Sequence, residues 1–423
     1  METSKKWRVV IIAIAIVDIL LIAAIGYVAL REDEEEARPP YAVISIRGSE
    51  LASSKYVDHG SGTLSDPYVI TGLDVELTRT TTQRLGMMIS GVEDHLIISG
   101  TRLHADYARP GFGLGYQFTG ILVSWSKNVT ILDCRFENLT MGVELSYSSV
   151  NISYNSFWSC WGGVLMEERN AHGAAPGTVI SGNSFEYTDY CVEALGSWDF
   201  TTVTDVLMKN NSMRWYQCAL GIYGIGHNFT ILGNYFYDGG DFAIEAGKLY
   251  ESYIAENRMY GHIRDGGGIS LSNSEEVRIE RNWIETGGPA ISIQWSENIT
   301  ISNNSIDSYL GSTLPMQFGV FLENSVSVNV TFNEITERTV GVVILSSSPS
   351  SSKVWIHHND FEMNFIQALD NSAMENHWDD GAGAGNYWED YDGSDADHDG
   401  IGDSPYMIDS DTWDSYPLLV PPV

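Results

Sequence analysis

A short phrase recurs along the middle of the chain, and it constrains the fold more than any other feature. The phrase is an apolar residue, two variable residues, Asn, a variable residue and a second apolar residue. Its nine copies contain Asn155, Asn183, Asn211, Asn234, Asn257, Asn282, Asn304, Asn333 and Asn359. The mean spacing is (359 − 155)/8, or about 25.5 residues. A unit this short cannot bury its own apolar residues, so neighbouring units must stack as a solenoid.

A second phrase follows each Asn and identifies the type of solenoid. It is a small residue, an apolar residue, a variable residue and an apolar residue, as in residues 142–145 and 268–271. Each unit therefore holds two or more short strands with alternating apolar residues. A propeller blade needs roughly 40–50 residues, and a leucine-rich repeat needs its own Leu and Asn spacing. The pattern predicts an all-β chain that forms a parallel β-helix of eleven or more coils over residues 41–388.

The recurrent Asn has a structural explanation. At a turn between stacked coils, its amide can bond to the amides above and below, and so form a ladder along the solenoid. We therefore assign these residues to structure and not to chemistry.

The first forty residues differ from the rest of the chain. Residues 9–30 are an apolar run of 22 (30 − 9 + 1), interrupted only by Asp18. Basic residues precede the run, and acidic residues follow it. This predicts a transmembrane signal anchor with a cytoplasmic tip over residues 1–30, an acidic stalk over residues 31–40, and the bulk of the chain outside the cytoplasm. A long cleaved signal peptide is the alternative.

Charge and cysteine content exclude several classes of partner. The chain has 56 acidic and 23 basic residues, a net charge of −33, which would repel nucleic acid and anionic lipid. Its four cysteines lack any CxxC spacing, which excludes a zinc module. Cys191 and Cys218 align in consecutive coils, so they form either a disulfide or a pair of stacked thiols.

Two phrases outside the repeats carry a resemblance to a known family. Residues 60–75 read GSGTLSDPYVITGLDV, and residues 385–391 and 395–409 read GNYWEDY and DADHDGIGDSPYMID. With the Asn-marked coils, they make residues 43–419 resemble NosD-like proteins of the carbohydrate-binding and sugar-hydrolase β-helix group. The resemblance implies a right-handed β-helix outside the cytoplasm. The family name comes from an accessory protein associated with copper supply to nitrous oxide reductase, a role that most relatives lack.

A column of side chains on one face of the coils is the first candidate site. Aligning the second phrase places Leu122, Glu144, Leu165, Glu193, Gly221, Glu245, Ser270 and Ser292 on one exposed line. Glu193 and Glu245 would stand on either side of a slot left by Gly221, as a general acid and base for a glycosidic bond. Glu144, Glu167, Trp198 and Tyr223 would bind the sugars. The alternative is a solvated acidic face.

The segment DADHDGIGD is the second candidate site. Asp395, Asp397 and Asp399 hold positions 1, 3 and 5 of a loop of the EF-hand type, with the Ile401 carbonyl at position 7 and Asp403 at position 9. Position 12 is Tyr406 instead of the usual Glu. We predict a structural calcium ion that closes an acidic cap over residues 389–423, with an acidic turn as the alternative.

A group of soft donors near the C-terminus is a weaker candidate. His357, His358, Met363, Met374 and His377 are residue types that suit copper. Adjacent His357 and His358 on a strand would point to opposite faces, so at most one could join a site, and the two methionines are explained as core residues. Copper binding is therefore not expected.

Taken together, these features predict a membrane-anchored surface protein that binds a glycan or another cell-surface component, or serves as a structural module. A polysaccharide hydrolase or lyase that uses Glu193 and Glu245 is the alternative, and copper supply is a minor one. Outside the cytoplasm, eight Asn-X-Ser/Thr sequons could carry glycans: Asn128, Asn138, Asn151, Asn210, Asn228, Asn298, Asn303 and Asn329.

Overall fold

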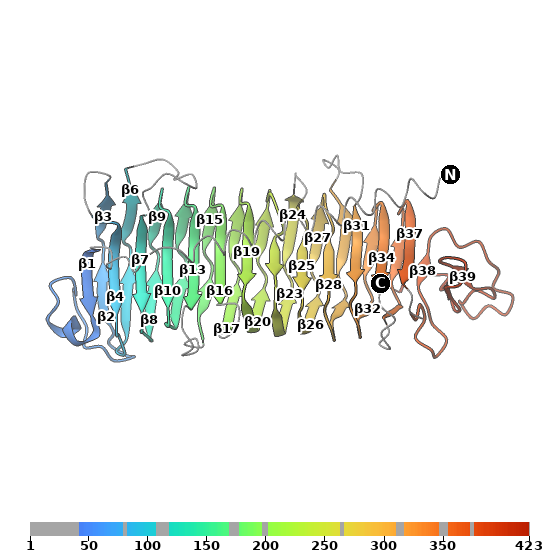
Figure 1. Cartoon of the computed structure of the whole chain (residues 1–423), viewed down its shortest axis with the longest axis horizontal. Coiled ribbons are helices and arrows are strands. Elements are labelled where there is room, and N and C mark those ends of the chain that lie inside the picture. The colour runs from blue at the N-terminus through green and yellow to red at the C-terminus, as the bar shows by residue number, and fades with distance from the viewer. Residues whose placement is uncertain are drawn as a thin grey trace. The chain divides into compact units, whose positions relative to one another are not determined.

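The fold is a parallel β-helix, as the repeats predict. The computed structural model describes residues 42–78, 83–106, 118–168, 177–196, 202–262, 266–309, 317–346, 354–372 and 376–422. Within these ranges the chain winds through three long parallel sheets of 13, 12 and 13 strands, stacked in chain order along one axis (Figure 1). Each coil contributes one strand to each sheet, and residues Ala42–Val423 form one compact unit.

The predicted membrane anchor and stalk, residues 1–40, lie outside the described residues. Among the residues that the structure describes, no helix is both long and apolar enough to cross a bilayer. The one described helix is the short 3-10 helix η1 (Gly48–Ser53).

The strands of the three sheets are short and regular. Sheet 1 contains β1 (Ala42–Arg47), β4 (Leu85–Ser90), β7 (Thr119–Ser124), β10 (Met141–Ser146), β13 (Gly162–Glu168), β16 (Tyr190–Gly196), β19 (Cys218–Tyr223), β22 (Ile244–Ala246), β25 (Ile269–Ser272), β28 (Ile291–Gln294), β31 (Phe318–Glu323), β34 (Val340–Ser346) and β37 (Ile366–Ser372). Sheet 2 contains β2 (Tyr68–Thr71), β5 (Leu96–Ser99), β8 (Val129–Leu132), β11 (Val150–Ser153), β14 (Val179–Ser181), β17 (Thr202–Lys209), β20 (Ile225–Leu232), β23 (Leu249–Ala255), β26 (Glu275–Glu280), β29 (Thr300–Ser302), β32 (Asn329–Thr331) and β35 (Trp355–His357).

Sheet 3 closes the triangular coil. It contains β3 (Asp74–Leu77), β6 (Arg102–Ala105), β9 (Arg135–Glu137), β12 (Ser156–Trp158), β15 (Ser184–Glu186), β18 (Ser212–Arg214), β21 (Tyr235–Tyr237), β24 (Arg258–His262), β27 (Trp283–Thr286), β30 (Ser305–Ser308), β33 (Glu334–Thr336), β36 (Asp360–Glu362) and β38 (Tyr387–Trp388). Beyond it, β39 (Tyr406–Met407) and β40 (Trp413–Asp414) form an antiparallel pair in the C-terminal cap.

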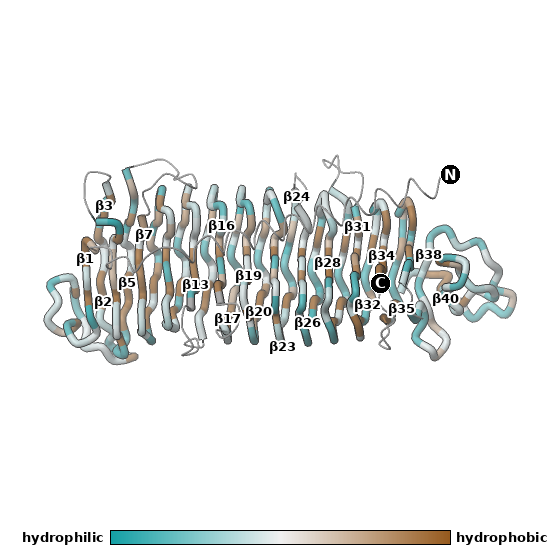
Figure 2. Tube along the Cα trace, viewed as in Figure 1, coloured by the Kyte–Doolittle hydropathy of each residue, from teal (hydrophilic) through white to brown (hydrophobic). Residues whose placement is uncertain are grey.

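Apolar side chains fill the interior because each strand alternates inward and outward residues. Ile231 and Ile254, for example, are paired neighbours in sheet 2, and both are fully buried. Phe136, Phe157 and Phe185 stack at 4.7 and 4.6 Å between ring centroids on the inner side of sheet 3. The same alternation gives the short apolar stretches along every coil in Figure 2. Burying one such side chain contributes roughly 1.5–3 kcal/mol, so stability is distributed along the whole solenoid.

The predicted asparagine ladder is confirmed at the corner between sheets 2 and 3. Asn257 Oδ1 accepts bonds from the backbone N–H and the side-chain amide of Asn234, at 2.9 and 3.0 Å. Its own amide donates to the Ile231 carbonyl at 2.9 Å and to Asn282 Oδ1 at 3.0 Å. The same pattern links every marker residue from Asn155 to Asn359. The buried amides are thus satisfied from coil to coil.

The ladder continues two steps beyond the repeats and ends in the cap. Asn359 donates to Asn386 Oδ1, and the Asn386 N–H donates to Asp414 Oδ2 at 2.7 Å. Asp414 also accepts the indole N–H of Trp388 at 2.9 Å and the backbone N–H of Tyr416 at 2.9 Å. This fully buried carboxylate therefore joins the last coil to the cap.

The four cysteines are buried free thiols, so the Cys191–Cys218 disulfide is not formed. The register pairs Cys218 with Tyr190, one residue away from the predicted alignment. Cys191 lies in the core, while Cys218 lies within 3.7 Å of the Tyr223 hydroxyl, which belongs to the outer side of sheet 1. The one-residue offset places the two thiols on opposite faces of the sheet.

Candidate functional site

The predicted column of carboxylates exists on the outer side of sheet 1. Strand pairing places Glu193 beside Gly221 and Gly221 beside Glu245, and it places Glu144 beside Leu165. The register of the column is therefore confirmed.

The predicted exposure of this column is wrong. Glu193 is only 1% exposed, and the neighbouring outward residues Leu165 and Leu195 are 3% and 7% exposed. Leu165 precedes Glu193 in the same column, and Leu195 follows it by two residues on the same strand, so both lie beside the buried carboxylate. Glu193 is therefore not presented to solvent, whereas Glu144 and Glu245 are half-buried.

The predicted slot at Gly221 is filled. A Cβ atom added to Gly221 would lie 2.4 Å from a ring carbon of Tyr223, so the tyrosine ring lies directly on the glycine. Its hydroxyl donates to Glu245 Oε2 at 3.1 Å. Gly221 therefore makes room for a side chain of the same coil instead of for a substrate.

Burial shifts the pKa values of this cluster upwards. It raises the pKa of Glu245, against the hydrogen bond from Tyr223, and the nearby Asp241 raises it further. Burial also raises the pKa of Tyr223 well above its usual value, with added effects of Cys218 and Glu245. Burial is thus the main cause of both shifts, and the Tyr223–Glu245 hydrogen bond links the two groups.

The other predicted sugar-binding residues are not gathered into one site. Glu144 and Glu167 are half-buried on neighbouring ladders of sheet 1. Trp198 lies outside the described residues.

The aspartate loop has the arrangement that the sequence predicts for its first three ligands. One carboxylate oxygen from each of Asp395, Asp397 and Asp399 lies within 4.8 Å of the others. Asp395 accepts the backbone N–H groups of Asp399 and Gly400, both at 3.2 Å, which shapes the turn. The carboxylate of Asp403 instead bonds to Ser394 and Ala396, at 3.1 and 2.8 Å.

The histidine pair differs from the sequence prediction. His357 and His358 place their Nδ1 atoms 2.7 Å apart, because His358 adopts a left-handed backbone (φ 56°) that breaks the strand alternation. Burial, and then His358, lower the pKa of His357.

The remaining soft donors do not complete a copper site. Met363 is 57% exposed and not a core residue, and the His377 ring stacks on Trp355 at 4.0 Å. Met374 lies outside the described residues. Among the His, Cys, Asp and Glu residues that the structure describes, the aspartate trio is the one group of three positioned around a common point.

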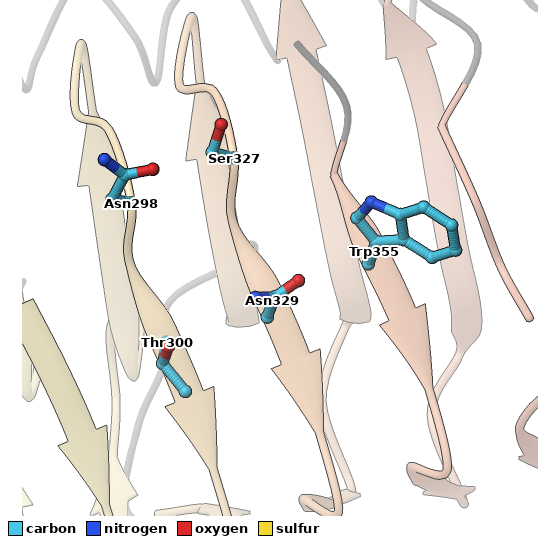
Figure 3. A pocket seen from close by; sticks show the side chains of 5 residues that line it. All are labelled: Asn298, Thr300, Ser327, Asn329 and Trp355. Atoms are coloured by element: carbon cyan, nitrogen blue, oxygen red, sulfur yellow. The ribbon is translucent and has the colours of Figure 1, made fainter. Parts of the chain in front are cut away.

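A hollow on the outer side of sheet 2 is a site that the sequence analysis missed. It has a volume of about 430 Å³ and is lined by Asn298, Thr300, Ser327, Asn329 and Trp355 (Figure 3). Thr300, Asn329 and Trp355 occupy paired positions on three successive strands, on the outer side of sheet 2. The His377 ring stacks on one face of the Trp355 ring, which fixes the orientation of the indole at the edge of the hollow.

The lining of this hollow has a definite chemical character. It offers one aromatic face, two amides and two hydroxyls, and no charged side chain. The N-I-T and N-V-T phrases gave no usable signal, because the register pairs Asn329 with Thr300 and so sets Asn298 level with Ser327. Only the register of strand pairing reveals that Trp355 lies beside Asn329.

The chain matches the model of one protein family. The family model described as periplasmic copper-binding protein (NosD) matches residues 70–248 and 227–393, more than half of the chain. A search of curated proteins finds no match.

Solved structures share the β-helix at low identity. A mutant of the periplasmic alginate epimerase AlgG has a TM-score of 0.51 at 12% identity, over 79% of this chain and 83% of its own. PfbA, a surface adhesin of Streptococcus pneumoniae, has a TM-score of 0.44 at 12% identity, over 68% of this chain and 81% of its own. A mannuronic acid specific polysaccharide family 6 lyase from human gut microbiota has a TM-score of 0.41 at 11% identity, over 78% and 91%. At these identities the epimerase supports the fold alone.

Proposed function

This chain belongs to the NosD family, and from that membership and the hollow beside Trp355 we propose that it is an extracytoplasmic β-helix protein that binds a glycan at its surface without processing it. The apolar residues 9–30 would hold it at the membrane. Copper, named in the family description, is not part of this proposal.

The hollow beside Trp355 is the observation that carries the proposal. The apolar C–H face of a pyranose can pack on an indole ring, while its hydroxyl groups bond to amide and hydroxyl side chains. The volume of about 430 Å³ falls within the range of small-ligand pockets. An uncharged lining on a chain of net charge −33 favours a neutral sugar over a uronate.

The cluster of Glu193, Tyr223 and Glu245 on sheet 1 favours binding over catalysis. Glu193 is buried, and the Tyr223 ring lies on the residue between the two carboxylates. A glycosidase needs its acid and base on either side of the scissile bond with room for the sugar. The described conformation of this cluster leaves no such room.

Trp355→Ala should reduce binding of neutral oligosaccharides by the full-length protein at least tenfold, about 1.4 kcal/mol, because the stacking platform is lost. Glycan-array binding followed by calorimetry measures this. Phe365→Ala is the matched control, since Phe365 is an 81% exposed aromatic outside the hollow.

Two results would contradict the proposal. Equal affinity in Trp355→Ala and the control would place the ligand elsewhere. Shortened glycan products that disappear in a Glu193→Gln, Glu245→Gln variant would establish the polysaccharide hydrolase or lyase instead.

We also propose that the aspartate loop binds a structural calcium ion. Three carboxylates around one point suit a hard cation that prefers oxygen ligands. Calcium should raise the melting temperature by several degrees, since a ligand at a hundred times its Kd adds about 2.7 kcal/mol. Asp397→Asn should lose this effect, whereas Asp411→Asn, an exposed acid of the same cap, should keep it. An unchanged calcium effect in Asp397→Asn would reject the site.

A further inference from the structure

A group of four carboxylates lies on the outer side of sheet 3, close to the cap but distinct from the aspartate loop. Strand pairing places Glu334 beside Asp360, and Asp360 beside Tyr387. Phe361 points inward and stacks on Trp388, so its neighbours Asp360 and Glu362 point outward. Continuing the same register from Trp388 brings Glu389 beside Glu362. We call Glu334, Asp360, Glu362 and Glu389 the carboxylate quartet.

Asp360 is the unusual member of the quartet. Its side chain is only 5% exposed, and its Oδ1 atom is buried without a hydrogen-bond partner. A buried polar atom that lacks a partner is costly, and an ionised one more so. Its neighbours are the other carboxylates of the quartet, which add repulsion instead of relief.

No cationic side chain compensates this charge. Among the described residues, no Lys, Arg or His forms an ion pair with a member of the quartet. Glu334 accepts the Ser305 hydroxyl at 3.1 Å, and Glu389 accepts the backbone N–H of Met363. Each of these bonds occupies one oxygen and leaves the negative charge in place.

We infer that the carboxylate quartet binds a divalent cation of the calcium type, with Asp360 and Glu362 as its principal ligands. Hard cations take six to eight oxygen ligands, and carboxylates with water complete such a shell. Asp360 and Glu362 stand two residues apart on β36, on the same face. Glu334 on β33 and Glu389 directly after β38 belong to the neighbouring rungs about 5 Å away, so carboxylates from three rungs can converge on one ion. No three members are yet within 4.8 Å of one another, so the ion would draw them together.

A proton alone would compensate the negative charge of the quartet less well than a divalent cation. It would neutralise Asp360 but leave Glu334, Glu362 and Glu389 facing each other. A divalent ion compensates two charges at once and also satisfies the orphaned oxygen of Asp360. Burial, followed by Glu362, Glu334 and Glu389, raises the pKa of Asp360 to about 7, so cation and proton would compete near neutral pH.

The test is a calcium chloride titration of the full-length protein by calorimetry at pH 8. Asp360→Asn should remove one binding event, and Glu362→Gln should weaken it at least tenfold. Asp397→Asn, in the aspartate loop, should retain this event. Glu186→Gln, which removes an exposed carboxylate from the same sheet, is the matched control. Binding to the quartet should also weaken about tenfold at pH 6, where a proton must be displaced.

Either of two results would overturn the inference. The first is an Asp360→Asn titration identical to that of the wild type. The second is a variant that is simply more stable at pH 8, with no change in its response to calcium, which would show that Asp360 holds only a proton. Asp360→Asn keeps the size of the side chain and removes a buried charge, so loss of the fold is not expected.

Discussion

Asn257→Ala should lower the free energy of unfolding by roughly 3 kcal/mol, one of the two largest effects that we expect from a single substitution. Asn257 accepts two bonds from Asn234 and donates to Ile231 and Asn282, all within 3.0 Å. Alanine would leave the Asn234 N–H and the Ile231 carbonyl without these partners in a site that water does not reach. Each buried polar group left alone costs about 1–3 kcal/mol.

Thermal unfolding followed by circular dichroism measures this loss. Asn151→Ala is the matched control, because Asn151 is an exposed residue of β11 outside the ladder and should shift the melting temperature little. Solenoid repeats couple mainly to their neighbours, so faster amide exchange should be confined to the coils around β23 and β26. Equal melting of Asn257→Ala and Asn151→Ala would show that the ladder is not a main source of stability.

The ladder and the coils could be predicted because they depend on repetition. One Asn every 25.5 residues on average fixes both the unit length and the corner that it occupies. The order of residues on each face then follows from counting, and Glu193, Gly221 and Glu245 are adjacent as expected.

The chemistry of that face could not be predicted because it depends on the conformations of the neighbouring side chains. A glycine in an outward column is compatible with a slot or with a ring that folds back onto it. Here the Tyr223 ring occupies the space, since its hydroxyl gains a bond to Glu245. Likewise, the alternation rule fails for His357 and His358 because a left-handed residue ends the strand there.

The hollow beside Trp355 and the carboxylate quartet were missed for a different reason. Their members come from successive coils, 26 to 29 residues apart, and no local motif joins the coils. Only the register of strand pairing shows that they are neighbours on the outer face of one sheet. In a solenoid, sites on the outer faces therefore become visible once the coils are aligned.

Asp414→Ala should destabilise the C-terminal cap by roughly 3–5 kcal/mol, because it removes the acceptor at which the ladder ends. The N–H groups of Asn386, Trp388 and Tyr416 would all lose their partner. Gly385 shows how tightly this residue is enclosed, since an added Cβ atom there would lie 1.9 Å from Asp414 Oδ1. Limited proteolysis should cut the cap of the variant first, and Asp409→Ala, a more exposed acid in the cap, should resist as the wild type does.

The pH dependence of the stability of Asp414→Asn tests how the charge of Asp414 contributes to the same contact. Burial raises the pKa of Asp414 to about 6, against the opposing bonds from Asn386 and Trp388. An acid whose pKa is higher in the folded protein than near 3.9 in the unfolded chain stabilises the fold when protonated, and this contribution is lost as the pH rises through 6. The stability advantage of the wild type over Asp414→Asn, measured by denaturant unfolding, should therefore shrink between pH 4 and pH 6. If the advantage grows instead, the hydrogen bonds to the carboxylate outweigh its burial, and the ladder ends on a fully ionised group.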